Sequence, residues 1–352
     1  MNETTTPATT PAAPASVNKL GLSKSEYKGA KSTLCAGCGH DAVTNHMTTA
    51  LYETGIEPHR VVKMSGIGCS SLTPAFFVSR GYGFNGLHGR VAPMATGVTL
   101  ANRQLQVLTI SGDGDTASIG MGHFLHTFRR NPRMVYVIEN NGIYGLTKGQ
   151  ISATADVGST LKSGWVNPYE PIDCCALAIQ LGCGFVARTF SGDGKQLVPL
   201  MKAALAFNGL ALIDVISPCM TFNNHPGSTK SYDWVKKHDI PLHELGFMAS
   251  DQSIEVDYEE GTSTKVELPD GCSLLLKKLG RDYDPRDHKQ ALYTLLESSE
   301  KQELLTGLLY FNDQVPPFDE TLKLVDDPLC SLPESRTRPS RAAFDEIMQS
   351  FR

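Results

Sequence analysis

The sequence lacks an apolar segment long enough to cross a membrane, because none of its hydrophobic runs approaches the about 20 residues of a bilayer-spanning helix. It also lacks an excess of basic residues: 32 Lys and Arg stand against 37 Asp and Glu in 352 residues. A net charge of -5 without a basic stripe offers no attractive surface to nucleic acid or to an anionic membrane. We therefore expect neither as a partner.

The amino-terminal segment lacks both the cationic start and the apolar centre of a secretory signal. Residues 1–18 are instead rich in Thr, Ala and Pro, a composition that favours a disordered tail. The chain has nine cysteines, and in a reducing compartment such thiols are more often ligands or catalysts than disulfides. We therefore expect a cytoplasmic protein.

The signatures of three common ligand sites are incomplete. The run from Gly81 to Gly86 has the form G-x-G-x-x-G, but no acidic residue follows at the about 20-residue distance of a dinucleotide-binding unit. A Walker lysine motif is absent. A calcium loop starting at Asp113 and Asp115 would have Ser118 where glycine is needed. The sequence therefore favours none of these three kinds of site.

What the sequence does contain is a strand-helix-strand pattern between residues 106 and 150. Short β-branched apolar runs at 107–110 and 134–138 flank residues 117–128, whose apolar positions recur at helical spacing. A helix between two such strands predicts a crossover unit with parallel strands. We therefore expect an α/β fold built on a doubly wound, mostly parallel sheet.

Similar patterns set the expected domain boundaries. Strands and helices alternate through the first two thirds of the chain, and beyond them we expect only a hairpin over 255–267 and a helix over 288–308. We divide the chain into a tail of residues 1–18, a sheet domain of residues 19–230 and an irregular extension of residues 231–352 that contacts another subunit. The other expected elements are strands at 61–64, 185–190 and 210–216 and helices at 41–53, 94–102, 172–180 and 194–207.

Polar residues follow the two strands of the crossover unit, and parallel strands deliver such loops to one edge of a sheet. Gly112 and Gly114 have no side chain, so their N–H groups can approach a phosphate. Asp113 offers a carboxylate, Asn141 an amide carbonyl and Ile143 a backbone carbonyl, which are oxygen ligands that Mg2+ prefers. The pattern predicts Mg2+ holding a diphosphate, with an ordinary acidic helix-capping turn as the alternative.

Four cysteines are expected at the same edge. Cys35 and Cys38 form a C-x-x-C loop before a helix, and Cys69 and Cys219 each follow an expected strand. Four thiolates suit either structural zinc or an iron–sulfur cluster, and their spacing alone does not choose between these. The other cysteines match no such motif, and most are expected to be buried neutral thiols: Cys174, Cys175, Cys183, Cys272 and Cys330.

A resemblance to a known family joins these two sites. GDG at 112–114, followed after a helix and a strand by NN at 140–141, resembles the thiamine diphosphate signature. The stretch NNGIYGLTKGQ at 140–150 is similar in particular to the β subunit of 2-oxoacid:ferredoxin oxidoreductases, and the likeness covers roughly residues 30–300. The resemblance implies thiamine diphosphate, Mg2+ and a 4Fe–4S cluster as cofactors. The cluster ligands it implies are Cys35, Cys38, Cys69 and Cys219.

The resemblance also implies a reaction and its partners. The reaction is the coenzyme A-dependent oxidative decarboxylation of a 2-oxoacid, or its reverse, with electrons passing through the cluster to ferredoxin. An α subunit would supply the pyrimidine-binding domain, in a dimer of αβ units. The favoured substrate is 2-oxoglutarate, with pyruvate as the alternative. One departure is Leu72, which stands where relatives that use 2-oxoglutarate commonly have a basic residue.

Two candidate catalytic residues follow from the same resemblance. Lys148 would lie at the substrate end of the cofactor, and His88 would donate a hydrogen bond to it. The ordinary alternatives are a solvated lysine and a structural loop histidine. The cofactor-binding residues that the resemblance implies are Ile67, Gly68, Cys69, Ser70, His88, Gly112, Asp113, Gly114, Asp115, Asn141, Ile143, Tyr144, Gly145, Leu146 and Thr147.

Two other functions remain open at this point. One is a non-redox thiamine diphosphate decarboxylase or synthase with a zinc site on the four cysteines. The other is an iron–sulfur electron-transfer subunit that has kept the fold without catalysis. Bound thiamine diphosphate and the visible colour of a cluster together distinguish all three functions.

Overall fold

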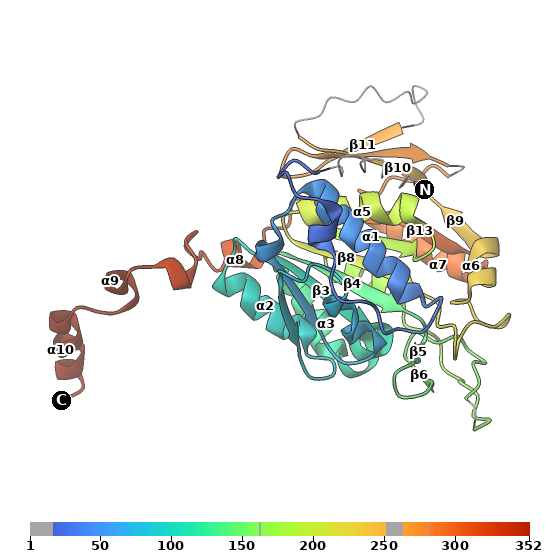
Figure 1. The fold of residues 1–352 in the computed structure, drawn as a ribbon, viewed down its shortest axis with the longest axis horizontal. Coiled ribbons are helices and arrows are strands. Elements are labelled where there is room, and N and C mark those ends of the chain that lie inside the picture. Colours follow the sequence, from blue (N-terminus) through green and yellow to red (C-terminus); the bar gives the residue numbers. More distant parts are fainter. Residues whose placement is uncertain (1–16, 162, 251–262, 280) are drawn as a thin grey trace, which may run out of the picture.

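The computed structural model describes residues 17–161, 163–250, 263–279 and 281–352. It shows one body of sheet and helices, from which the end of the chain extends as an arm (Figure 1). The tail expected over residues 1–18 lies almost wholly outside the described residues, and so does the turn of the hairpin expected over 255–267. Among the described residues, no helix is both long and apolar enough to span a membrane.

The body is organised around a sheet of eight strands in the order β2-β1-β3-β4-β8-β7-β13-β9. The six strands from β2 to β7 run parallel to one another, whereas β13 lies antiparallel to β7 and β9 runs parallel to β13. The expectation of a mostly parallel α/β sheet is therefore confirmed. The strands are β1 Val61–Ser65, β2 Tyr82–Asn85, β3 Gln106–Gly112, β4 Met134–Asn140, β7 Phe185–Phe190, β8 Leu210–Ile216, β9 Asp239–Pro241 and β13 Leu304–Phe311.

Helices cover both faces of this sheet. Two separate clusters of buried apolar side chains place α1 and α5 on one face and α2, α3, α4 and α7 on the other. These helices are α1 Gly39–Thr54, α2 Val91–Ala101, α3 Met121–Arg130, α4 Cys174–Gln180, α5 Gly194–Ala206 and α7 His288–Glu300. The shorter ones are the π-helix η5 Asp115–Ile119, α6 Tyr232–His238, α8 Phe318–Thr321, α9 Glu334–Thr337, α10 Arg341–Ser350 and the 3-10 turns η1 Lys24–Tyr27, η2 Pro58–Arg60, η3 Cys69–Ser71, η4 Thr73–Ala75 and η6 Leu329–Ser331.

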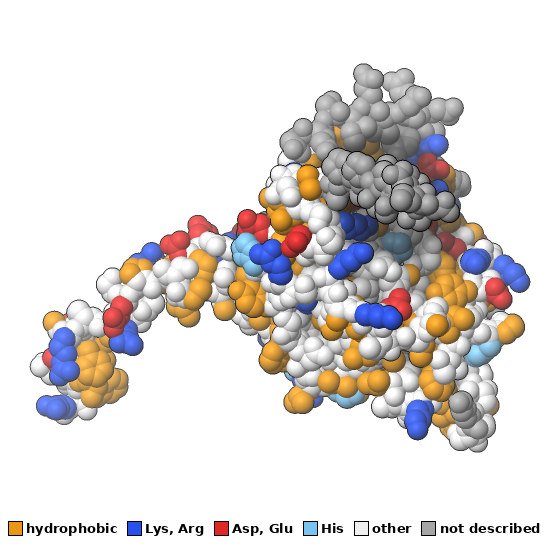
Figure 2. All heavy atoms as spheres, in the orientation of Figure 1, with side chains coloured by type: hydrophobic (Ala, Val, Ile, Leu, Met, Phe, Trp, Pro, Cys, Tyr) orange, Lys and Arg blue, Asp and Glu red, His pale blue; other side chains and the backbone are white. Residues whose placement is uncertain are grey.

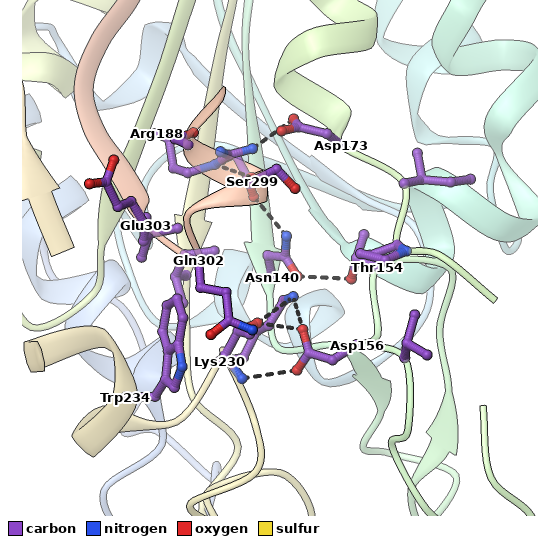
Figure 3. A pocket seen from close by; sticks show the side chains of 18 of the residues that line it. Asn140, Thr154, Asp156, Asp173, Arg188, Lys230, Trp234, Ser299, Gln302 and Glu303 are labelled. Carbon is purple, nitrogen blue, oxygen red and sulfur yellow. Dashed lines mark hydrogen bonds and ion pairs between the residues drawn. The ribbon is translucent and has the colours of Figure 1, made fainter. Parts of the chain in front are cut away.

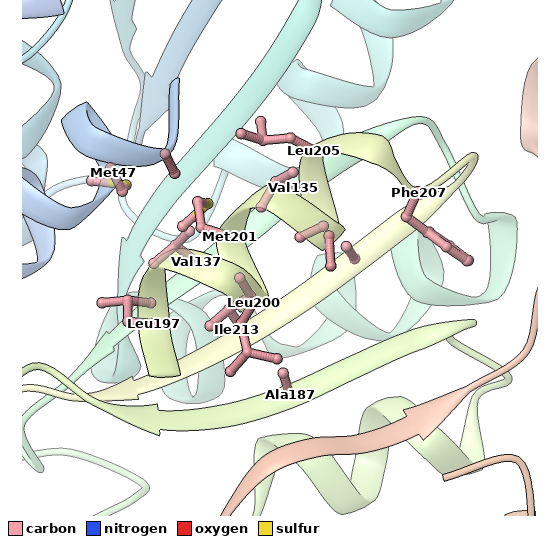
Figure 4. Close-up of a cluster of buried hydrophobic side chains, with 14 of the residues drawn as sticks. Met47, Val135, Val137, Ala187, Leu197, Leu200, Met201, Leu205, Phe207 and Ile213 are labelled. Carbon is pink, nitrogen blue, oxygen red and sulfur yellow. The ribbon is translucent and has the colours of Figure 1, made fainter. Parts of the chain in front are cut away.

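Alternate residues of the central strands supply the two cores. Val135 and Val137 of β4 pack with Leu200 of α5 on one face, whereas Tyr136 packs on the other. Figure 4 shows Val135, Val137 and Ile213 of β8 beside α5. Because both faces are covered, all seven residues of β4 and of β8 are buried, which is why these strands read as continuous apolar runs.

Two smaller sheets complete the body. The antiparallel strands β10 His243–Met248, β12 Ser273–Lys278 and β11 Ser263–Glu267 pair in that order, and Leu274 and Leu276 join the core under α5. The pair β5 Ile143–Tyr144 and β6 Gln150–Ile151 follows β4 directly. This small hairpin therefore lies at the carboxyl edge of the main sheet.

The prediction of a helix over 288–308 is wrong for residues 301–308. Helix α7 ends at Glu300, and residues 304–311 form β13. The run LLTGLLYF is continuously apolar, and such a run does not by itself distinguish a buried strand from the end of a helix. The region beyond residue 230 therefore contributes two strands, β9 and β13, to the main sheet.

The last part of the chain forms an arm anchored at α8. The Asp319 carboxylate forms ion pairs with Arg103, at 2.5 Å, and with Arg133, at 3.0 Å. These arginines lie just before β3 and β4, so the arm leaves from the amino edge of the sheet. No residue of α9 or α10 is buried, and apolar side chains are visible on α10 in Figure 2. The exposed apolar side chains on α10 and directly after it are Phe344, Ile347, Met348 and Phe351.

Candidate functional site

A polar pocket lies where β1, β3 and β4 end, at the carboxyl edge of the sheet. All fifteen residues expected to bind a cofactor line it, together with His40, which no motif pointed to. The pocket encloses only about 30 Å³ on this chain, whereas sites that bury a drug-sized molecule measure about 300–1,000 Å³. The pocket can therefore enclose only one end of a ligand.

Asp113 lies at the bottom of this pocket and is almost completely buried, at 1% exposure. One carboxylate oxygen accepts hydrogen bonds from the hydroxyl groups of Ser152 and of Thr154, the latter at 2.7 Å. The other oxygen accepts the backbone N–H of Asn141 at 3.3 Å. Burial raises the pKa of the Asp113 carboxyl, and these hydrogen bonds oppose that rise. A bound cation would favour the charged form further.

Asn141 and Ile143 lie in the turn that follows β4, and they line the same pocket as Asp113. The Asn141 side-chain oxygen accepts the backbone N–H of Ile143 at 3.1 Å, which closes a tight turn. Asn223 donates its side-chain amide to the Asn141 carbonyl at 2.7 Å and so fixes the turn from outside. The structure thus brings the three expected Mg2+ ligands to one end of the pocket, and their role as ligands stays a prediction.

Asp115 gathers three loops around the pocket, and in this structure it does not act as a simple helix cap. One carboxylate oxygen accepts from the Gly89 backbone N–H at 2.8 Å and lies 2.8 Å from His88 Nδ1. The other accepts the Ser111 hydroxyl at 3.0 Å. A Cβ at Gly66 would overlap the carboxylate, so only glycine fits beside it. Asp115 is only 2% exposed, so these contacts hold the surrounding loops in fixed positions around the pocket.

His88 is oriented by Asp115 and remains partly exposed. Its Nε2 has no hydrogen-bond partner among the residues that the structure describes, so this atom is available to a ligand. Lys148 lies outside the pocket lining, in the exposed part of the turn after β5, with an unusual left-handed φ of 77°. Its backbone N–H donates to the Gly145 carbonyl at 3.1 Å, which fixes the backbone while the ammonium group stays in solvent.

The four expected cluster cysteines converge beside the same pocket. A Cβ at Gly145 would lie 3.4 Å from the sulfur of Cys69 and 3.7 Å from that of Cys219. Cys219 lies near enough to raise the pKa of Cys38 and of Cys69, and Cys35 near enough to raise that of Cys69. Gly145 and Cys69 both line the pocket. The cysteine group and the pocket therefore share a wall.

Burial raises the pKa of the Cys38 thiol to about 12 and that of Cys69 to about 11. On binding a metal cation, these thiols would release their protons to solvent, because the cation stabilises the thiolates, as happens in metal-thiolate sites. No three Cys, His, Asp or Glu side chains among the described residues lie close enough to hold a single ion. A cluster spreads its ligands around several iron atoms, and a donor set of four thiolates at one edge fits it.

Other cysteines stand apart from this group. Cys174, Cys175, Cys183 and Cys272 are buried, which agrees with the expectation for most of them, whereas Cys330 is exposed on the arm. Burial raises the pKa of the Cys183 thiol to about 12, so it stays neutral.

Beneath the pocket lies a buried acid that no motif indicated. Glu139, at 0% exposure, accepts the Thr73 hydroxyl at 3.0 Å and lies 3.8 Å from His40 Nδ1. Burial raises the pKa of Glu139 well above its usual range and lowers the pKa of His40 to about 4. His40 is therefore neutral near pH 7. His40 also lies 2.6 Å from the Ser217 hydroxyl, which joins the first cysteine loop to the last.

A larger cavity of about 560 Å³ lies beyond Asn140 and Thr154 (Figure 3). Most of its charged residues are already paired: Arg188 binds Asp173 at 2.7 Å and Asp214 at 3.1 Å. Lys230 binds Asp156 at 3.0 Å in the same way. None of the fifteen expected cofactor residues lines this cavity. Its connection to the smaller pocket is Thr154, whose hydroxyl lies 3.0 Å from Asn140 and 2.7 Å from Asp113.

Comparison with known proteins gives consistent results. Residues 66–215 match the family model of the thiamine pyrophosphate enzyme, C-terminal TPP binding domain. A 2-oxoacid:ferredoxin oxidoreductase subunit beta of a Sulfolobus species is 36% identical over 290 residues, which are 82% of this chain and 85% of the relative. The 2-oxoglutarate synthase subunit KorB of Methanocaldococcus jannaschii is 35% identical over 67% of this chain and 88% of its own.

A solved structure shares the fold over nearly the whole chain. The 2-oxoglutarate:ferredoxin oxidoreductase from Magnetococcus marinus, with 2-oxoglutarate, coenzyme A and succinyl-CoA bound, has a TM-score of 0.72 and 28% sequence identity. The match covers 94% of this chain and 96% of that one. The likeness therefore includes the sheet and the edge where the pocket lies.

Proposed function

The chain belongs to the β subunits of the 2-oxoacid:ferredoxin oxidoreductases, and from this premise we propose which of its residues carry the reaction. It is an oxidoreductase subunit that acts on a 2-oxoacid with coenzyme A, together with an α subunit. In the oxidative direction, one 2-oxoacid anion and one thiol give one acyl thioester, one CO2 and one proton. Two one-electron acceptors are reduced, so charge and electrons balance.

The observation that carries the proposal is the shared wall between the pocket and the cysteine group. Cys69 and Gly145 line the pocket, and a Cβ at Gly145 would lie 3.4 Å from the sulfur of Cys69 and 3.7 Å from that of Cys219. Thiamine diphosphate supplies a place for the electron pair that decarboxylation leaves, and a cluster passes electrons one at a time. These two kinds of chemistry require the proximity that this wall provides.

At the diphosphate end, we assign Asp113, Asn141 and the Ile143 carbonyl as Mg2+ ligands. Asp113 is buried and held by hydroxyl groups, so its oxygen atoms are oriented before a ligand arrives. Gly112 and Gly114 let the main chain come close to the phosphates. His88 Nε2 donates to the cofactor while Asp115 holds its Nδ1. Lys148 serves the substrate end, where 2-oxoglutarate carries two carboxylates.

At the other end, Cys35, Cys38, Cys69 and Cys219 would hold a 4Fe–4S cluster, which would supply one-electron transfer to ferredoxin. The bound 2-oxoglutarate of the Magnetococcus marinus structure favours that substrate over pyruvate. The small enclosed volume of the pocket favours a site completed by the α subunit, in a dimer of αβ units. The nine free cysteines suit a reducing, cytoplasmic location.

The cluster ligands can be tested with two cysteine variants of equal chemistry. Cys219→Ser should lose most of the cluster, because one of its four thiolates is gone. The loss is measured as iron per chain and as visible absorbance after anaerobic purification. The matched control is Cys330→Ser on the arm, which should keep its iron. Equal iron in both variants would remove Cys219 from the ligand set.

The metal end can be tested by calorimetry. Asp113→Ala should abolish Mg2+-dependent binding of thiamine diphosphate while the circular dichroism spectrum stays unchanged. Wild-type affinity in this variant would contradict the assignment. A colourless zinc protein with bound thiamine diphosphate would indicate the non-redox enzyme instead, and a cluster without thiamine diphosphate would indicate an electron-transfer subunit.

The need for an α subunit is tested by turnover. The purified chain with Mg2+, thiamine diphosphate and its cluster should not reduce a viologen dye with 2-oxoglutarate and coenzyme A until the α subunit is added. Sustained dye reduction by this chain alone would show that the active site is complete without a partner.

A further inference from the structure

The four cysteines of the group come from three separate parts of the chain. Cys35 and Cys38 lie before α1, Cys69 begins η3, and Cys219 follows β8. Three buried polar side chains stand within four residues of these cysteines, and a fourth comes from β4. None of the four is more than 1% exposed, and we call them the buried network: His40, Thr73, Glu139 and Ser217.

Glu139 holds the Cys69 loop through Thr73. The Thr73 hydroxyl donates to the Glu139 carboxylate, at 3.1 Å from one oxygen and 3.0 Å from the other. Thr73 follows Leu72, whose backbone N–H donates to the Cys69 carbonyl at 3.1 Å. After burial, Glu139 is a further cause that raises the pKa of the Cys69 thiol and that of Cys38. Its carboxyl group therefore lies close beneath two of the three cysteine loops.

His40 joins the other two loops to each other. Its Nδ1 lies 2.6 Å from the Ser217 hydroxyl oxygen and 3.8 Å from the Glu139 carboxylate. The preceding residue, Gly39, donates its N–H to the Pro218 carbonyl at 3.2 Å. A Cβ at Gly39 would lie only 2.5 Å from the Ser217 hydroxyl oxygen. The first and the last cysteine loops are therefore in direct contact, with Glu139 below them.

The same strand end also belongs to the cofactor pocket. Asn140 follows Glu139 and accepts the Ser217 backbone N–H at 2.8 Å. The next residue is Asn141, a proposed Mg2+ ligand, and His40 itself lines the pocket. The end of β4 thus contacts the cysteine loops and the proposed metal end at once.

We propose that Glu139 is a positioning residue, which fixes the three cysteine loops relative to one another and to the cofactor pocket through Thr73 and His40. Groups behind the ligands of a metal site orient those ligands, and changing such a group commonly weakens metal binding about 10–100-fold. A carboxyl group between loops from three parts of the chain holds four sulfurs at the spacing of one cluster. The inference rests on the proposed function, because it takes the four cysteines as ligands of one cluster.

Two variants break the contact between Glu139 and Thr73 from opposite sides. Glu139→Leu keeps a similar side-chain size and removes the acceptor, whereas Thr73→Val keeps the shape and removes the donor. Glu139→Gln is the conservative variant, since its amide oxygen still accepts from the Thr73 hydroxyl. The matched control is Thr109→Val on β3: Thr109 is equally buried, and its hydroxyl donates to the Val135 carbonyl at 3.0 Å, within the sheet.

The experiment uses the assembled αβ enzyme, purified anaerobically. Iron per chain, the rate at which a chelator removes the iron, and the electron paramagnetic resonance spectrum after reduction by dithionite report on the cysteine site. The urea midpoint of the metal-free full chain reports on stability alone. Thr73→Val and Glu139→Leu should release iron about tenfold faster than the wild type, with a changed spectrum, because the sulfurs are held less firmly.

The other two variants separate positioning from a general loss of stability. Glu139→Gln should release iron at nearly the wild-type rate, because it keeps the acceptor. Thr109→Val should lower the urea midpoint about as much as Thr73→Val does, since each removes a buried hydrogen bond. It should nevertheless keep the wild-type rate of iron release and the wild-type spectrum.

Three results would overturn the proposal. One is iron release at the wild-type rate from Thr73→Val, which decides the matter also where Glu139→Leu does not fold. Another is equally fast release from Thr109→Val, which would reflect stability alone. The third is release from Glu139→Gln as fast as from Glu139→Leu. A wild-type enzyme without iron would refute the proposed function and this inference with it, whereas a wild type with iron and unchanged variants refutes the inference alone.

Discussion

The carboxylate of Asp113 depends on two hydroxyl groups that belong to a different loop. Thr154 donates to it at 2.7 Å, inside a region from which water is excluded. Burial already raises the pKa of Asp113, so each donor that favours the charged form supports cation binding. The loop after β6 therefore holds the proposed metal ligand Asp113 in place without contributing a ligand itself.

Thr154→Val should weaken Mg2+-dependent binding of thiamine diphosphate about tenfold or more. The variant keeps the shape of the side chain but removes a hydrogen bond to a charged group, worth about 1.5–3 kcal/mol. Titration calorimetry measures the change. Thr160→Val, at an exposed position of the same loop, is the control and should bind as the wild type does. An unchanged affinity in Thr154→Val would show that this hydroxyl does not support Asp113.

A second buried side chain makes stability depend on pH. His243 is 3% exposed, its Nδ1 has no hydrogen-bond partner, and burial lowers its pKa to about 4. Between about pH 6.5 and pH 4 the unfolded chain binds a proton at this histidine and the folded chain does not. The folded state should therefore lose up to about 3 kcal/mol from this residue as the pH falls through that range.

His243→Gln should flatten this pH dependence, measured as the urea midpoint under neutral and under mildly acidic conditions. The midpoint of the wild type should fall more on acidification than that of the variant. His59→Gln changes an exposed histidine and should leave the wild-type slope intact. Equal slopes in the wild type and His243→Gln would mean that His243 is already protonated in the folded chain.

The sequence identified pocket residues where they occur in a short run with a chemical pattern. Asp113 and Asn141 are of this kind, because each directly follows a strand. Thr154, Glu139 and His40 were not found, since a lone threonine, a strand-end glutamate and a histidine beside a cysteine carry no spacing signal. Only the folded chain brings them together. Their contribution is to hold or bury the residues that the motifs contain.

At the scale of elements, the π-helix η5 and the loop before α2 touch through two glycines. A Cβ at Gly120 would lie 2.6 Å from the Asp115 carbonyl and 3.0 Å from the Gly89 Cα. Gly89 has a left-handed φ of 66° and donates its N–H to the Asp115 carboxylate. This backbone contact fixes His88 relative to the pocket.

Gly120→Ala should lower both stability and cofactor affinity, because the added methyl group forces the His88 loop away from Asp115. We expect a loss of about 1–3 kcal/mol from such overpacking, read from thermal unfolding. Gly122→Ala is the matched control two residues on: its added Cβ meets nothing within 4 Å, and alanine favours a helix. Equal melting temperatures for the two variants would contradict the contact.

Helices and strands were predicted correctly where the characteristic spacing of apolar residues continues along the whole element. The strands at 107–110 and 134–138 and the helix at 194–207 were recognised within two residues of their ends. β13 was assigned to a helix because its two faces are both buried, which removes the alternation that marks a strand. The π-helix was also missed, because a wider helical turn leaves no trace in so short a segment.

At the scale of the whole molecule, the arm and the pocket lie at opposite edges of the main sheet, where they can contact different subunits. The arm leaves from the amino edge of the sheet, and the pocket opens at the carboxyl edge. An α subunit that completes the pocket meets the carboxyl edge. We therefore predict that the exposed apolar side chains of α10, at the far end of the arm, hold the second αβ unit of a dimer.

Deletion of residues 329–352 should leave the melting temperature of the isolated chain unchanged, because none of these residues is buried. The truncated chain should still bind its α subunit but should yield single αβ units, measured by light scattering on gel filtration. A truncated chain that forms the same assembly as the full chain would show that the arm does not join the units.

The position of β13 also determines when the body can fold during synthesis. β7 and β13 pair side by side, although residues 191–303 separate them in the chain. The sheet therefore cannot close until residue 311 has been made, and the ribosome then adds the arm over several further seconds at about 5–20 residues per second. The cofactor edge can thus be formed while the arm is still attached to the ribosome.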